Sequence, residues 1–139
     1  MSSVLLGHDQ AVAEWVGRIN GKAFHPPYAA IGTVDRSGTL TGGYVFTGYN
    51  QDGIEVSIAG RGVVARDPCR AMARYVFADL GCVRLVAHTR RSNKAIRQLM
   101  PRLGFHFEGT CRRFYGDEDA FQYSLTKDDL GAFVAKWRL

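Results

Sequence analysis

The stretch from Gly53 to Gly81 constrains the fold of this chain more than any other, because a strand pattern runs directly into a helix pattern. Residues 54–59 read Ile-Glu-Val-Ser-Ile-Ala, an alternation that is typical of a strand. Side chains two residues apart on a strand share a face, so Glu55 and Ser57 point to the same side. The sequence therefore predicts a carboxylate and a hydroxyl together on one face of a sheet.

A basic turn and an amphipathic helix follow this strand. Arg61 and Arg66 lie in the turn, and Asp67-Pro68 predicts the helix start, with the Asp67 carboxylate accepting a hydrogen bond from a first-turn amide. Gly81 predicts the helix end. A helix N-terminus after such a turn suits a phosphate, although an ordinary strand–helix unit explains the segment equally well. The apolar helix face carries Cys69, Met72, Ala73, Val76, Phe77 and Leu80.

Length and composition predict one ordinary globular domain, residues 1–139. The chain has no run of about eighteen apolar residues and no secretion-type leader, so we expect no membrane association and a cytoplasmic location. The net charge of +5 favours an anionic partner, either nucleic acid or a phosphorylated cofactor. Cys69, Cys82 and Cys111 lack the spacing of metal ligands, so we expect reduced thiols and no metal site.

The remaining patterns predict an α+β (α/β) fold in which an antiparallel meander precedes a strand–helix–strand crossover. The crossover makes strands 54–59 and 83–88 parallel. Ser92 is the expected cap of the helix after them. The expected helices are residues 9–20, 67–81, 92–104 and 128–137, and the expected strands are residues 29–34, 40–49, 54–59, 83–88, 105–111 and 120–125.

This order of elements, with the local sequences between residues 76 and 129, resembles the GNAT N-acetyltransferase superfamily. Its ribosomal-protein-acetylating type and short bacteriophage-encoded members are the most similar in appearance. The resemblance implies a mixed, mostly antiparallel sheet flanked by helices, with a V-shaped opening between the two parallel strands. The likeness is carried by residues 79–85, Asn93 with Ala95, Leu103-Gly104-Phe105, Glu108-Gly109, Arg112, and Asp119 with residues 123–126.

The resemblance also implies that acetyl-CoA, or another acyl-CoA, lies in this opening. The sequence departs from the family pattern at two places. Val64 and Arg66 replace glycines of the phosphate loop, where backbone amides approach the pyrophosphate. Met100 stands where many members have a tyrosine that protonates the leaving thiolate. The implied cofactor-binding residues are Ile58, Arg61, Gly62, Val63, Arg66, Asn93 and Arg97.

Acyl transfer to an amine needs a base that removes the amine proton. Glu55 is the expected base, because it is the only carboxylate on strand 54–59. Ser57 shares its face, and Tyr115 is a further candidate for proton transfer. His88, at the end of a buried strand, is expected to be structural. Two candidates for substrate contact lie in the aromatic loop after the first helix, His25 and Tyr28.

Two classes of function stay open. The first is a CoA-dependent N-acyltransferase whose acceptor is an amine on a small molecule, a protein or a modified nucleobase. The second is a GNAT-fold protein without acetyl transfer, re-purposed for DNA modification of the phage Mom type, which defeats host restriction, or for nucleic-acid or protein binding. A phage-encoded protein would act in the host cytoplasm. The discriminating residues are Val64, Arg66 and Met100.

Two groups of basic residues favour a polyanion, although such stripes are also typical of a solvated face. The exposed edge of the sheet, with Phe133 and Trp137 near the C-terminus, favours a homodimer. The sequence determines neither the acceptor nor the acyl group. The basic groups are Arg66, Arg70 and Arg74 on one helix, and Arg90, Arg91, Lys94, Arg97 and Arg102 on and before the next.

Overall fold

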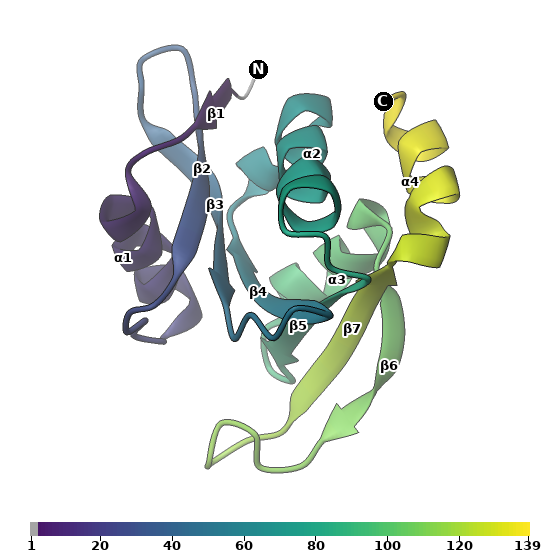
Figure 1. The fold of residues 1–139 in the computed structure, drawn as a ribbon. Coiled ribbons are helices and arrows are strands. Elements are labelled where there is room, and N and C mark those ends of the chain that lie inside the picture. The colour runs from purple at the N-terminus through teal and green to yellow at the C-terminus, as the bar shows by residue number, and fades with distance from the viewer. Residues whose placement is uncertain (1–2) are drawn as a thin grey trace.

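A computed structural model describes residues 3–139 as a seven-stranded mixed sheet with helices on both faces (Figure 1). The strand order is β1-β2-β3-β4-β5-β7-β6, and β4 and β5 are the parallel pair. This is the predicted fold class. The strands are β1 (Ser3–Leu5), β2 (Ala29–Val34), β3 (Leu40–Thr47), β4 (Gly53–Ala59), β5 (Arg84–Arg90), β6 (His106–Cys111) and β7 (Ala120–Thr126).

The helices form two unequal layers. Helix α1 (Asp9–Asn20) covers β2, β3 and β4 on one face, over a small apolar cluster that includes Val12, Val16 and Val45. The other three helices lie on the opposite face, over the main core (Figure 1). No helix covers β5, β7 and β6 on the α1 side (Figure 1), so polar side chains lie there. These three helices are α2 (Arg66–Ala73), α3 (Lys94–Leu103) and α4 (Leu130–Trp137).

The sheet opens between β4 and β5. The two strands pair through only four residue pairs, Gly53–Val56 with Arg84–Ala87. Beyond this point β4 stays paired with β3 as far as Ala59, and β5 stays paired with β7 as far as Arg90. Because each strand follows a different outer partner, the two separate after Val56 and Ala87. The predicted opening is therefore present.

Two predicted helix caps are wrong. Helix α2 begins at Arg66 after Ala65, without a side-chain cap, so Pro68 is its third residue and not its first. This is tolerated because N–H groups of a first helical turn have no partner within the helix. Helix α3 is capped by Asn93, whose Oδ1 accepts a hydrogen bond from the Ile96 amide at 3.2 Å. The Ser92 hydroxyl donates to Glu118 instead.

Other boundaries also differ from the prediction. Strand β1 was not expected, because three residues are too short to show a period, and its partner is β2. Residues 74–79 continue α2 as a π-helical turn. Phe133 is buried in the main core and Trp137 donates to the Leu103 carbonyl at 3.3 Å, so neither side chain forms the apolar surface expected of a dimer interface.

Gly62 has a packing role that its sequence position does not indicate. It lies in the turn Arg61–Val63, where a Cβ atom would overlap the hydroxyl oxygens of Thr33 and Thr41. These two hydroxyls are hydrogen-bonded to each other at 2.9 Å. The absence of a side chain at residue 62 therefore lets the turn sit directly on β2 and β3.

We expect Gly62→Ala to lower the free energy of unfolding by about 1–3 kcal/mol, because the added methyl group forces the two threonines apart. The control is Gly131→Ala in α4, where a Cβ meets no atom within 4 Å. That change should be neutral or raise stability by about 0.4–1 kcal/mol. Urea denaturation followed by circular dichroism measures both. Equal stability of the two variants would contradict this account of the turn.

Candidate active site at the opening between β4 and β5

A narrow pocket of about 20 Å³ lies where β4 and β5 separate. Both strands contribute to it, and so do the end of α1, the start of α3 and the β6–β7 loop. Residues distant in sequence therefore meet at the point where the sheet loses its own hydrogen bonding. The lining residues are Asn20, Lys22, Ser57, Ile58, His88, Thr89, Arg90, Asn93, Ile96 and Tyr115.

Two polar atoms at this pocket are buried without a partner among residues 3–139. Asn20 donates from Nδ2 to the Ile58 carbonyl at 3.1 Å, but its Oδ1 accepts nothing. The Thr89 hydroxyl likewise has no hydrogen bond, although the residue is only 3% exposed. Leaving a buried polar group unsatisfied costs roughly 1–3 kcal/mol. Two such atoms at one pocket leave a hydrogen-bond donor and an acceptor open to a water molecule or to a polar ligand.

A larger cavity of about 510 Å³ adjoins the narrow pocket, since Asn20, Asn93 and Ile96 line both. Arg61 and Arg102 also line it, and neither makes an ion pair within the described part of the chain. The cavity thus carries uncompensated positive charge on one side of the opening.

Glu55 and His88 form a close pair beside the narrow pocket. Glu55 Oε1 lies 2.9 Å from His88 Nδ1, and the two side chains are 28% and 11% exposed. Burial opposes ionisation of Glu55, but the hydrogen bond and charge of His88, with the charge of Lys22, lower the pKa of the carboxyl below its usual value. Glu55 is therefore a carboxylate at neutral pH.

Tyr115 covers the same pocket from the β6–β7 loop. Its ring lies 4.3 Å from the Arg90 guanidinium. Burial, followed by the negative charge of Glu55, raises the pKa of the Tyr115 hydroxyl to about 12. Tyr115 therefore keeps its proton at neutral pH and is a hydrogen-bond donor there.

The structure brings together some of the residues predicted for the cofactor and separates others. Ile58 and Asn93 line the narrow pocket, and Arg61 lines the larger cavity. Gly62 and Val63 are buried and border neither space. They are turned toward the core because the Val63 carbonyl accepts the Tyr44 hydroxyl at 2.8 Å.

Two predicted cofactor residues have other partners. Arg66 Nε donates to the Arg138 carbonyl at 3.1 Å. Arg97 donates to the Arg91 carbonyl at 2.7 Å and lies over the Phe121 ring. Neither lines the narrow pocket or the larger cavity.

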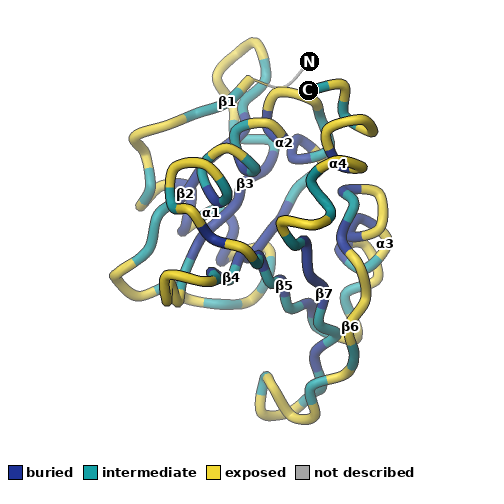
Figure 2. The backbone as a smooth tube through the Cα atoms, turned by 45° about the vertical axis from the view of Figure 1, so that its right-hand side comes forward, coloured by how far each residue is buried: buried dark blue, intermediate teal, exposed yellow. Residues whose placement is uncertain are grey.

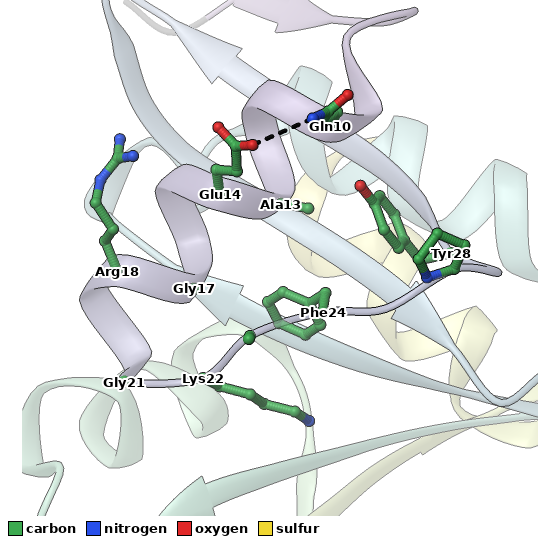
Figure 3. A pocket seen from close by; sticks show the side chains of 11 residues that line it. Gln10, Ala13, Glu14, Gly17, Arg18, Gly21, Lys22, Phe24 and Tyr28 are labelled. Atoms are coloured by element: carbon green, nitrogen blue, oxygen red, sulfur yellow. Dashed lines mark hydrogen bonds between the residues drawn. The ribbon is translucent and has the colours of Figure 1, made fainter.

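The predicted substrate residues lie beside a separate groove. This groove, of about 720 Å³, runs between α1 and residues 21–28 (Figure 3). Tyr28 lines it, whereas His25 is exposed and does not. Lys22 lines both the groove and the narrow pocket. The groove therefore reaches the opening in the sheet through Lys22.

Sequence reasoning missed His88, Asn20 and Thr89 as site residues. His88 has a weak signal, because it shares a strand face with Val86, the residue paired with Glu55. Asn20 is the last residue of α1, and Thr89 is one β-branched residue in an apolar strand, so their sequence positions are unremarkable. Only the assembled fold brings them to the pocket.

Several predicted polyanion-binding arginines are held by intramolecular contacts. Arg90 pairs with Asp117 and Glu118, and Arg91 pairs with Asp119. Arg97 donates to the Arg91 carbonyl. Among residues 3–139 there is no cluster of three or more possible metal ligands. In the same range, no helix combines the length and apolarity that a bilayer span requires. All three cysteines are free thiols.

No protein-family profile and no curated protein matches this sequence. Solved structures do match it. A GCN5-related N-acetyltransferase from Brucella melitensis is 24% identical, with a TM-score of 0.66 over 79% of this chain and 56% of that one. The spermidine/spermine N-acetyltransferase of Vibrio cholerae is 14% identical, with a TM-score of 0.69 over 95% of this chain and 99% of that one.

A ribosomal-protein-alanine acetyltransferase from Vibrio fischeri is 19% identical, with a TM-score of 0.60 over 73% of this chain. The chain spans 63% of that enzyme and 56% of the Brucella protein, so it is shorter than both. Each of these structures aligns with this chain at a TM-score of 0.60 or more, although the identities are 24% or lower. The chain therefore has the fold of the GNAT N-acetyltransferases.

Proposed function

We propose that this protein is an N-acyltransferase that moves an acyl group, acetyl in the simplest case, from acyl-CoA to an amine. The observation that carries the proposal is the opening between β4 and β5, with two unpartnered buried polar atoms at its narrow end. Strand backbone left unpaired there can hydrogen-bond an extended ligand that itself carries amides. The pantetheine arm of CoA is such a ligand.

The residues at the opening fit this cofactor. Asn20 Oδ1 can accept an amide N–H, and the Thr89 hydroxyl can donate to a carbonyl. Arg61 and Arg102 supply charge for the phosphates in the larger cavity. In this proposal side chains, and not backbone amides, bind the phosphates. The turn suits that arrangement, because Val64 replaces a glycine and the Val64 amide already donates to the Arg61 carbonyl at 3.1 Å.

Acyl-CoA, when bound, supplies an acyl group activated as a thioester. The Glu55 carboxylate accepts the proton of the attacking amine, because its pKa is low enough to keep it ionised. Tyr115 keeps its hydroxyl proton and donates a hydrogen bond to the departing sulfur, the role for which Met100 is unsuited. Ser57, on the Glu55 side of β4, orients the amine at the narrow pocket.

The acceptor approaches through the groove between α1 and residues 21–28, which Lys22 connects to the pocket. Of the two predicted substrate residues, His25 and Tyr28, Tyr28 lines this groove and contacts the acceptor. Action on a nucleobase gains no support from this arrangement, because Arg90, Arg91 and Arg97 are bound within the molecule. The surface we propose for a homodimer is the exposed edge strand β6, where Phe107 is 58% exposed.

Calorimetric titration with acetyl-CoA tests the proposal directly. We expect micromolar binding by the parent protein, and roughly tenfold or greater loss in Arg61→Ala and Arg102→Ala, since each removes a charged contact to phosphate. Arg70→Ala is the control, because Arg70 is exposed on α2 and lines neither cavity. Absence of binding by the folded parent protein would contradict the function. A large effect of Arg66→Ala alone would move the phosphate site to the start of α2.

Replacing the base should separate binding from turnover. We expect Glu55→Gln to retain acetyl-CoA affinity and to lower turnover at least about 100-fold, because an amide cannot take the amine proton. Release of CoA thiol with spermidine and with an alanine-terminated peptide as acceptors measures this. Asp52→Asn, an exposed neighbour at the start of β4, is the matched control and should leave both quantities unchanged. Equal turnover of Glu55→Gln and parent would exclude Glu55 as the base.

A further inference from the structure

A chain of hydrogen bonds runs across the uncovered face of the sheet behind Glu55, from β4 to β6. His88 on β5 contacts Glu55 through Nδ1 and Gln122 through Nε2, each at 2.9 Å. Gln122 on β7 then donates from Nε2 to Glu108 Oε1 at 2.9 Å. Arg84 holds Glu108 through both guanidinium nitrogens, including a contact of 2.8 Å to Oε2. The chain therefore links the proposed base to the ion pair between Glu108 and Arg84.

The ionised Glu108 carboxylate decides which group donates and which accepts in each hydrogen bond between Glu108 and His88. Hydrogen bonds from Arg84, and then from Gln122 and Ser124, lower the pKa of Glu108 to about 2, so this carboxylate only accepts. Gln122 must then turn its NH₂ group toward Glu108 and its carbonyl oxygen toward His88. The Cys111 thiol also donates to that oxygen, at 3.4 Å. His88 therefore has to carry a hydrogen on Nε2.

This requirement decides which nitrogen of His88 exchanges its proton. With Nε2 always protonated, the contact between Nδ1 and Glu55 Oε1 holds one proton or none. When that proton is absent, Nδ1 has a lone pair and the Glu55 carboxylate, which only accepts hydrogen bonds, turns away from it. The ring cannot change to the other neutral form without breaking the bond to Gln122.

We propose that His88 is the proton-accepting partner of Glu55, and that the Arg84–Glu108–Gln122 chain positions it by keeping the ring hydrogen on Nε2. This inference rests on the proposed acyl transfer. In that reaction the N–H bond of the acceptor would break with its electron pair left on nitrogen, and the proton would go to Glu55. The nitrogen would form the bond to the acyl carbon while the carbon–sulfur bond breaks, and the sulfur would leave as the CoA thiolate. Rotation of the carboxyl group then delivers the proton to His88 Nδ1.

The surroundings of His88 suit this role. The Phe114 ring stacks on the imidazole with centroids 4.2 Å apart, which restricts the tilt of the His88 ring. The groups that set the local charge come from every adjoining element. They are Glu55 on β4, Lys22 after α1, Arg84 and Arg90 on β5, Tyr115 in the β6–β7 loop, and Cys111 and Glu108 on β6.

Nitrogen NMR of the histidine rings tests the positioning without any substrate. The chain has four histidines, so a His88→Asn variant assigns the His88 signals. We expect the neutral ring to show hydrogen on Nε2 in the parent protein. Glu108→Leu should weaken this preference and populate hydrogen on Nδ1, because Gln122 loses the acceptor that fixes the direction of its amide. Ser124→Ala is the control, since Ser124 donates to Glu108 Oε2 at 2.9 Å without contacting Gln122.

Hydrogen on Nδ1 in the parent, or the same distribution in parent and Glu108→Leu, would overturn the inference. The pH profile of kcat/KM gives a second readout. His88→Asn, which can hold Glu55 but cannot take a proton, should change the shape of this profile and lower its plateau about tenfold. An unchanged profile in His88→Asn, with acetyl-CoA binding intact, would overturn the inference while leaving the proposed function standing.

Discussion

The structure depends on the point where β4 and β5 stop pairing. Four residue pairs hold the two strands in parallel, and after Val56 and Ala87 each strand follows a different neighbour. A sheet normally satisfies its own backbone groups, so an interruption in its centre is costly unless something else completes the hydrogen bonding. The end of α1 does so in part, because Asn20 bonds the Ile58 carbonyl. The buried atoms that still lack a hydrogen-bond partner, Asn20 Oδ1 and the Thr89 hydroxyl, lie at the candidate site.

The two faces of the sheet serve different purposes around this opening. On one face α2, α3 and α4 enclose the main core, which fixes both strands firmly. The opposite face is covered by α1 over the first half of the sheet only, and the polar chain from Glu55 to Arg84 occupies the uncovered half. In Figure 2 the β6–β7 hairpin extends away from the main body, with an exposed tip. Its loop returns Phe114 and Tyr115 to the opening.

Charge is distributed in a way that separates structural from functional arginines. Arg84, Arg90 and Arg91 have carboxylate partners, and these pairs fasten β5 and the following turn to the C-terminal hairpin. Arg61 and Arg102 have none among residues 3–139 and line the larger cavity. A net positive charge alone does not distinguish these two groups. The neighbours of each arginine in space do distinguish them, because a carboxylate beside a guanidinium compensates its charge.

The sequence by itself determined the four helices and six of the seven strands, because helix and strand periods are local properties of the chain. It predicted α1 and β2 with their observed bounds, the parallel pair, and the shared face of Glu55 and Ser57. It did not predict that His88 meets Glu55, that Asn20 reaches β4, or that Gly62 lies against Thr33 and Thr41. Those contacts depend on strand register and on how α1 and the turn pack. Tertiary structure alone decided them, since no local pattern records which distant residues become neighbours.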